Sequence, residues 1–297
     1  MSLGDALALG CAFIWSLSIV LFKIAEENVD PVLLNLLKNT MAFVLMIPTI
    51  LILGPEHWSP NVTGMDWALM IGSGLLGIGI ADALILKCLK LIGPTRLAIV
   101  ECLYAPCIIT LSVLFLAESL TIFQFVGAGM VLFAVYLVNY RPTEQGVEPK
   151  DLIAGTVMGA SGILLMAIGI IWVKPVLDRL PLLQVVEIRL AAGVVSSIGF
   201  WVGTRRPMAS WRDFLKSDRK GLIATACFLS TYIAMMMWVA GFKFNDASVA
   251  AVLNQTSTIF TVVLSVLLLR EQLTVTKVTG TLLAICGVLL MTHFAAS

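Results

Sequence analysis

The chain has 297 residues, of which 59% are hydrophobic and only 12% are charged, and its formal net charge at pH 7 is +1. An ordinary soluble domain carries about 25% charged residues, so this composition excludes a soluble fold and predicts an integral membrane protein. The balanced charge also argues against a nucleic-acid partner. We therefore expect the lipid bilayer to be the main partner of the surface.

Ten segments of the chain are long and apolar enough to cross a bilayer, which takes about 20 mostly apolar residues as a helix. The predicted fold is all-α, with ten transmembrane helices. They lie at about 4–25, 31–53, 66–89, 94–117, 121–140, 152–176, 181–203, 220–243, 246–269 and 274–294. The first segment lacks the basic leader of a signal peptide, so we expect it to be retained as a span.

The sequence contains an internal repeat. Residues 111–121 read LSVLFLAESLT and residues 264–274 read LSVLLLREQLT, with eight of eleven positions identical at an offset of 153. Five spans per half is an odd number, so the two halves must cross the membrane in opposite directions. We predict two inverted five-helix repeats, at 1–140 and 152–297, joined by a linker at 141–151, with a site near their pseudo-two-fold axis.

Ionisable side chains inside a span are costly in lipid and therefore mark candidate functional positions. Glu101 is the strongest candidate, about two turns into the predicted fourth span, and Asn254 is its mate in the second half. A carboxylate there can bind a substrate ammonium group or exchange a proton, or it can form a purely structural ion pair. Four further charges are candidates for coupling or ion pairing: Lys38, Asp82, Glu187 and Arg189.

Aromatic and small polar side chains complete the predicted binding site. Trp15 and Tyr232 lie well inside their spans, and Tyr104 and Trp238 lie in the predicted fourth and eighth spans. Rings of this kind can stack on a substrate or bind a cation. Such rings also populate the membrane interfaces, which remains the alternative. We expect hydrogen bonds to the substrate from four further residues: Ser16, Ser161, Asn254 and Gln255.

The sequence GASG at 159–162 matches the pattern around the nucleophile of rhomboid-type intramembrane proteases. That chemistry needs a histidine at the depth of Ser161, whereas His57 lies in a loop and His293 at the very end of the last span. We therefore expect no enzymatic activity and no catalytic residues. The six cysteines lack metal-ligand spacing and no nucleotide-binding loop occurs, which predicts a protein without a metal or other cofactor.

The leucine-rich run that ends in Glu118-Ser-Leu-Thr121 and in Glu271-Gln-Leu-Thr274 resembles the end of an EamA domain of the drug/metabolite transporter superfamily. The opening helix and the basic residue early in the second span of each half, Lys38 and Arg189, share the resemblance. It implies a secondary transporter of small metabolites with a central cavity lined by the first, third, fourth, sixth, eighth and ninth spans. Lys38 stands where the resemblance leads us to expect an arginine.

These observations predict a secondary active transporter in the cell (inner) membrane that moves a small polar metabolite by alternating access. We expect an amino acid or an amine as the substrate, export as the direction and a proton as the candidate coupling ion. An organic-cation uptake carrier and a non-transporting membrane scaffold or sensor are the alternatives. The sequence is compatible with a monomer and with a homodimer.

Basic residues predict the orientation of the chain, because cytoplasmic loops are enriched in Lys and Arg. They concentrate in one set of alternate loops, above all in 204–220. This distribution predicts that this loop is cytoplasmic and that both termini lie outside. The family resemblance predicts the reverse, with both termini inside.

Overall fold

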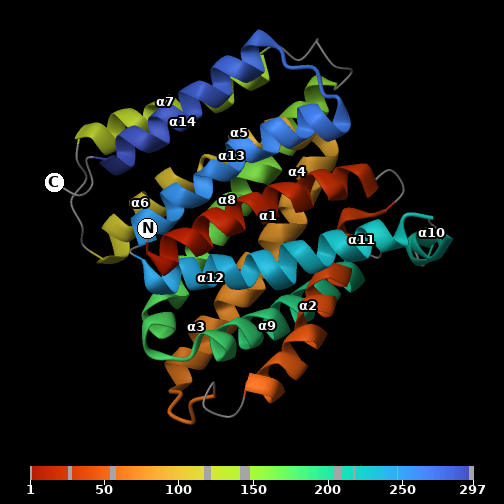
Figure 1. Ribbon diagram of the computed structural model, residues 1–297, viewed down its shortest axis with the longest axis vertical. Coiled ribbons are helices and arrows are strands. Elements are labelled where there is room, and N and C mark those ends of the chain that lie inside the picture. The colour runs from red at the N-terminus through yellow and green to blue at the C-terminus, as the bar shows by residue number, and fades with distance from the viewer. Residues whose placement is uncertain are drawn as a thin grey trace.

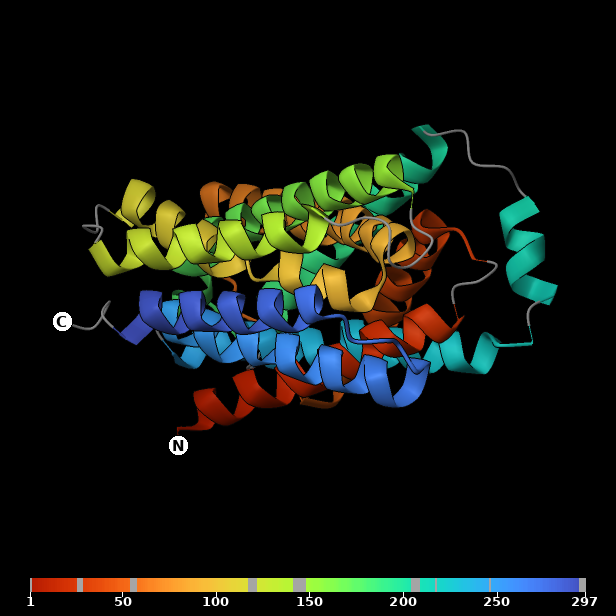
Figure 2. The ribbon, with the colours of Figure 1, turned by 90° about the horizontal axis from the view of Figure 1, so that it is seen from above.

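The computed structural model describes residues 2–25, 29–53, 58–116, 122–140, 148–203, 209–216, 218–245 and 247–293. All regular elements within these ranges are helices, which form an elongated bundle (Figures 1 and 2). The start of α1 and the end of α14 lie at the same end of this bundle (Figure 1). The Glu118–Thr121 motif, His57 and linker residues 141–147 lie outside the described residues.

Both halves contain the same succession of long helices. The first half consists of α1 (Leu3–Ala25), α2 (Pro31–Leu53), α3 (Gly64–Gly74), the π-helical segment Leu75–Ile80, α4 (Ala81–Ile92), α5 (Pro94–Glu101), α6 (Tyr104–Leu116) and α7 (Ile122–Tyr140). The second half consists of α8 (Pro149–Arg179), α9 (Leu182–Gly203), the short α10 (Ala209–Lys216), α11 (Lys220–Cys227), the π-helical segment Phe228–Ala234, α12 (Met235–Phe244), α13 (Ala247–Leu269) and α14 (Val275–His293).

Seven of the described helical stretches are long and apolar enough to span a membrane, which makes the chain a multi-pass membrane protein. They are Leu3–Ala25, Pro31–Ile52, Gly64–Ile92, Pro94–Leu111, Pro149–Arg179, Leu182–Gly203 and Lys220–Phe244. Shorter apolar stretches lie at Phe125–Ala134, Leu253–Leu269 and Val275–Gly287. These three fall within α7, α13 and α14, where the sequence predicts the remaining spans, and the count of ten remains a prediction.

Gly93 separates α4 from α5 within the first half. Its φ of 81° lies in a region that side-chain-bearing residues rarely adopt, so glycine is suited to this sharp reversal. Pro94 then begins α5, at a position where the missing N–H removes no helical hydrogen bond. This local sequence turns the chain back into the bundle directly after the helical stretch Gly64–Ile92, which contains α3 and α4 and is called the α3–α4 rod below.

The internal repeat is visible in the backbone as a matching pair of π-helical segments. Leu75–Ile80 interrupts the α3–α4 rod. Phe228–Ala234 interrupts the helical stretch Lys220–Phe244, which contains α11 and α12 and is called the α11–α12 rod below. Leu75 and Phe228, which begin them, are 153 residues apart, the offset of the sequence repeat. A π turn inserts one extra residue into the pattern of helical hydrogen bonds and often accompanies a functional site. Since the two segments are related by the repeat offset, this irregularity occurs at equivalent positions in the two halves.

Glu271, which belongs to the repeated motif, joins three helices at one end of the bundle. Its carboxylate accepts a hydrogen bond from the Thr95 hydroxyl at 2.7 Å and pairs with the Lys277 ammonium group at 2.5 Å. Thr95 lies on α5, and Lys277 lies on α14. The acidic residue of the motif therefore fixes the connection between α13 and α14 against the start of α5.

The last helices of the two halves, α7 and α14, lie side by side along one edge of the bundle (Figure 1). The buried residues Gly127, Val131 and Ala134 of α7 recur on α14 at the repeat offset as Gly280, Ala284 and Gly287, all buried. A Cβ on Gly287 would lie 2.7 Å from the carbonyl oxygen of Gly127. Small residues thus allow the two backbones to approach closely, as is common between helices in lipid.

Replacing Gly287 with valine is expected to separate α7 from α14 and lower stability by about 1–3 kcal/mol, because the added atoms meet backbone. Gly129→Val is the matched control, since nothing lies within 4 Å of a Cβ placed there. Thermal unfolding of the purified protein in detergent measures both variants. Equal unfolding temperatures for the two variants would show that this contact does not hold the helix pair together.

Candidate functional site

A cavity of about 100 Å³ lies between the helices of the two halves. Its lining comes from α1, α2, the α3–α4 rod, α5, α6, α8, α9, the α11–α12 rod and α13. Within the described part of the chain, α7 and α14 contribute no lining residue. Lys38 on α2 and Arg189 on α9 also line the cavity. These two helices are not among the six spans that the family resemblance led us to expect around it.

Glu101 occupies a break in a helix. α5 ends at Glu101 and α6 begins at Tyr104, and Pro106 has no N–H to donate to the carbonyl of Cys102. At the same break, the side-chain amide of Gln255 on α13 donates a hydrogen bond, 3.3 Å long, to the backbone carbonyl of Glu101. The second half thereby supports the main chain at the point where the first half places its buried carboxylate.

The side chain of Glu101 is buried and lines the cavity without a cationic partner. Only 8% of the residue is exposed, and the indole Nε1–H of Trp15 donates a hydrogen bond to Oε1 at 3.2 Å. No ion pair joins Glu101 to another residue in the described ranges. The geometry therefore disfavours the alternative in which Glu101 only holds helices together through an ion pair.

Lys38 and Asp82 form a buried ion pair that also lines the cavity. Lys38 lies on α2 and Asp82 on α4, so the pair connects two helices of the first half. Two charges buried this deeply depend on each other, because removing one partner leaves the other uncompensated in a low-dielectric interior. Lys38 is thus committed to Asp82 and does not neutralise Glu101.

Arg189 brings a second cation to the cavity. It forms no direct ion pair in the described ranges, although the Asp82 carboxylate attracts it electrostatically. The residue is 1% exposed, and the centre of its guanidinium group lies 5.7 Å from the ring centroid of Trp238. This is the distance range of a cation–π interaction. Its Nε and Nη1 atoms have no hydrogen-bond partner within the described part of the chain.

Further polar atoms around the cavity lack hydrogen-bond partners among the described residues. They are both amide atoms of Asn254, Oε1 of Gln255 and the hydroxyl of Tyr104. A buried polar atom left unsatisfied costs about 1–3 kcal/mol, so native structures rarely accumulate several in one place. Their clustering around one cavity indicates a site built for a polar ligand.

The cavity is lined by nine of the residues that the sequence analysis singled out. They are Trp15, Lys38, Asp82, Glu101, Tyr104, Arg189, Trp238, Asn254 and Gln255. The sequence repeat places Glu101 and Asn254 at equivalent positions of the two halves, and both residues line the same cavity.

Ser16 and Tyr232 are placed elsewhere. The Ser16 hydroxyl lies 2.7 Å from the carbonyl oxygen of Ala12 and 2.9 Å from that of Ser257, a contact that ties α1 to α13. The Tyr232 hydroxyl lies 2.5 Å from the Thr49 hydroxyl on α2. Both side chains therefore satisfy their polar groups in helix–helix contacts, and neither lines the cavity.

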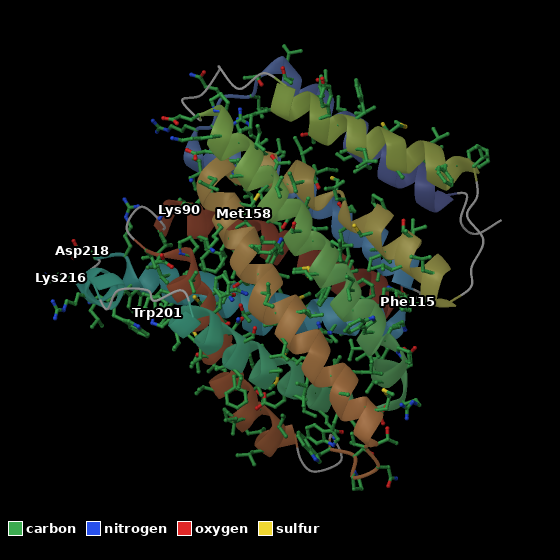
Figure 3. The ribbon with its side chains drawn as sticks, turned by 180° about the vertical axis from the view of Figure 1, so that it is seen from behind. Lys90, Phe115, Met158, Trp201, Lys216 and Asp218 are labelled. Atoms are coloured by element: carbon green, nitrogen blue, oxygen red, sulfur yellow. The ribbon has the colours of Figure 1, made fainter. Side chains whose placement is uncertain are left out.

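Ser161 and Glu187 also lie outside the cavity lining. Ser161 is exposed on α8, because the flanking glycines face α4: a Cβ on Gly162 would lie 2.9 Å from the carbonyl oxygen of Ala81. The GASG sequence thus serves the crossing of α8 and α4 that is visible in Figure 3. Glu187 is buried on α9, two residues before Arg189, a spacing that points the two side chains in different directions.

Sequence reasoning did not select Cys11 and Ser257, which line the cavity. Cys11 precedes Trp15 by four residues and therefore lies on the same face of α1. Ser257 follows Asn254 by three residues on α13. Helical spacing from the selected residues was the signal that could have found both, since neither side chain is charged or aromatic.

The fold and the cavity together define a helical membrane protein with two related halves around a charged internal site. The chain belongs to the EamA-like transporter family, whose model matches residues 2–140 and again residues 153–293. It is accordingly a membrane transporter of the drug/metabolite type, and the two matches confirm the resemblance recognised in the sequence.

A solved structure described only as "Crystal structure of protein" has the same fold. The two chains share 18% sequence identity and superpose with a TM-score of 0.69, over 99% of this chain and 97% of that chain. No curated protein matches this sequence.

The dependence of Lys38 and Asp82 on each other gives a test of stability. Lys38→Met alone is expected to destabilise the protein by about 3–5 kcal/mol because Asp82 is left unpaired, whereas Lys38→Met combined with Asp82→Leu should recover most of the loss. Thermal unfolding in detergent compares the variants. A double variant no more stable than Lys38→Met would contradict this account of the pair.

Proposed function

We propose that this protein is a secondary active transporter in the cell (inner) membrane that exports a small polar metabolite, an amino acid or an amine. The observation that carries the proposal is Glu101, a buried carboxylate at a helix break that lines the cavity and has no cationic partner in the part of the chain that the structure describes. A charge in this position is costly for a protein with a purely structural role. It is favourable when a substrate ammonium group or a transported proton compensates it.

The interruptions around the cavity support an alternating-access mechanism. Gly77 and Ile78 line the cavity from one π-helical segment, and Ser230 and Ala234 line it from its counterpart. π turns and broken helices are places where a helix can bend. We propose that the chain has ten spans, arranged as inverted five-helix repeats at 1–140 and 152–297 with a linker at 141–151. During transport the two halves rock about these π turns and broken helices.

Glu101→Gln is expected to reduce substrate counterflow in proteoliposomes to background, because the amide cannot neutralise an ammonium group or carry a proton. Glu187→Gln is the matched control: it removes a buried carboxylate that does not line the cavity, so counterflow should persist. A screen of radiolabelled amino acids, amines, sugar phosphates and other organic cations identifies the substrate. Wild-type counterflow in Glu101→Gln would refute the role of this residue.

The same screen separates the proposal from its alternatives. Counterflow of organic cations alone would favour a cation carrier, and the direction of net flux would decide between uptake and export. Absence of counterflow for every compound would favour the scaffold or sensor. The pH inside the vesicles, measured during substrate movement, tests whether a proton is the coupling ion. Acidification that depends on the substrate would support proton coupling.

We propose that both termini lie outside the cell, because the basic residues gather at the opposite end of the bundle. Lys90 and Lys216 lie toward one side of the molecule, away from Phe115 (Figure 3). Lys216→Cys, at an exposed position of α10, should resist a membrane-impermeant thiol reagent in intact cells once the native cysteines are replaced. Ser2→Cys should react, and the reverse pattern would place the termini inside.

A further inference from the structure

Two opposite charges line the same cavity without pairing with each other. Glu101 and Arg189 form no ion pair within the described part of the chain, and two guanidinium nitrogens of Arg189 have no hydrogen-bond partner there. The other two charges of the cavity, Lys38 and Asp82, form an ion pair and so neutralise each other. The site therefore presents one separate negative group and one separate positive group.

Each of these charges is held by an aromatic ring. Trp15 donates its indole N–H to Glu101, and the face of Trp238 lies against the guanidinium group of Arg189. The two rings orient the charged groups but carry no net charge. Asp82, the partner of Lys38, also attracts Arg189 electrostatically, but neither Glu101 nor Arg189 has a direct ion-pair partner among the described residues. Glu101 comes from the first half and Arg189 from the second, which places the two poles of the site on opposite repeats.

We propose that the cavity binds a zwitterion, with its ammonium group on Glu101 and its carboxylate on Arg189. This inference rests on the proposed function and narrows it from amines and amino acids to compounds that carry both charges. A planar guanidinium group with free nitrogens suits a carboxylate because it can donate two parallel hydrogen bonds. One dipolar ligand then compensates both buried charges at once.

The rest of the lining combines polar side chains, among them Asn254, Gln255, Ser230 and Ser257, with apolar side chains that can contact the rest of the ligand. Ile78, Ile163, Met166 and Met235 are apolar, and their side chains surround the space with the ring of Tyr104. Apolar surface of this kind favours an apolar substituent, and methionine side chains adapt to different shapes. The substrate class is therefore an α-amino acid with an apolar side chain.

Ligand-induced thermal shifts of the full chain in detergent test the inference without requiring transport. Two sets of probes differ only in their charged groups: L-leucine, 3-methylbutylamine and 4-methylpentanoate; and L-phenylalanine, phenethylamine and 3-phenylpropionate. In at least one set the amino acid should bind more tightly than both partners, by a factor on the order of 10 to 100, because each loses one charged hydrogen-bonding group. If neither amino acid binds more tightly than its matched amine, the inference is wrong.

Variants assign the two poles. Arg189→Gln should lower the affinity for the amino acid to that of its amine and leave amine binding nearly unchanged. Arg189→Lys should recover only part of the preference. Arg96→Gln is the control, because it changes a buried arginine that does not line the cavity, and it should retain the preference. An equal loss for amino acid and amine in Arg189→Gln would overturn the assignment.

The wild-type probe comparison decides the question even if Arg189→Gln does not fold. An amino acid that binds in detergent but shows no counterflow would support the zwitterion site and contradict the proposed transport. An amine that binds as tightly as its amino acid and is transported would leave the proposed function standing and overturn this inference.

Discussion

The cost of holding charge inside a membrane is the constraint on which this structure depends. An ionised side chain in a span must find a partner, reach water or serve a ligand. Lys38 and Asp82 meet the requirement by pairing with each other. Glu101 and Arg189 do not pair, although both line the same cavity, and this separation makes the cavity a binding site in our account and not only a packing defect.

The rest of the bundle keeps these charges apart and still allows the two halves to move relative to each other. Along the edge, α7 and α14 pack through small residues at matching positions, which gives a close and regular contact between the halves. Around the cavity the helices are irregular instead, with π-helical segments in both rods and a break after Glu101. Rigid packing at the edge and irregular helices at the centre suit a protein whose halves rock about a fixed site.

The sequence predicted those features that follow from periodicity and duplication, including the helix positions, the repeat and the shared depth of Glu101 and Asn254. It could not predict the direction in which a side chain points, because the rotation of each helix is set by its neighbours. Ser161 shows this limit: Gly162 faces α4 and turns the serine outward. Tyr232 shows it as well, since the partner of its hydroxyl is Thr49 on a distant helix.

The central claim is that the substrate bridges Glu101 and Arg189. The most direct test is an experimental structure with the substrate identified by counterflow bound to the protein. Our account predicts an ammonium group within hydrogen-bonding distance of the Glu101 carboxylate and a carboxylate against the guanidinium group of Arg189. A substrate bound away from this cavity, or a direct ion pair between Glu101 and Arg189 beside it, would contradict the account.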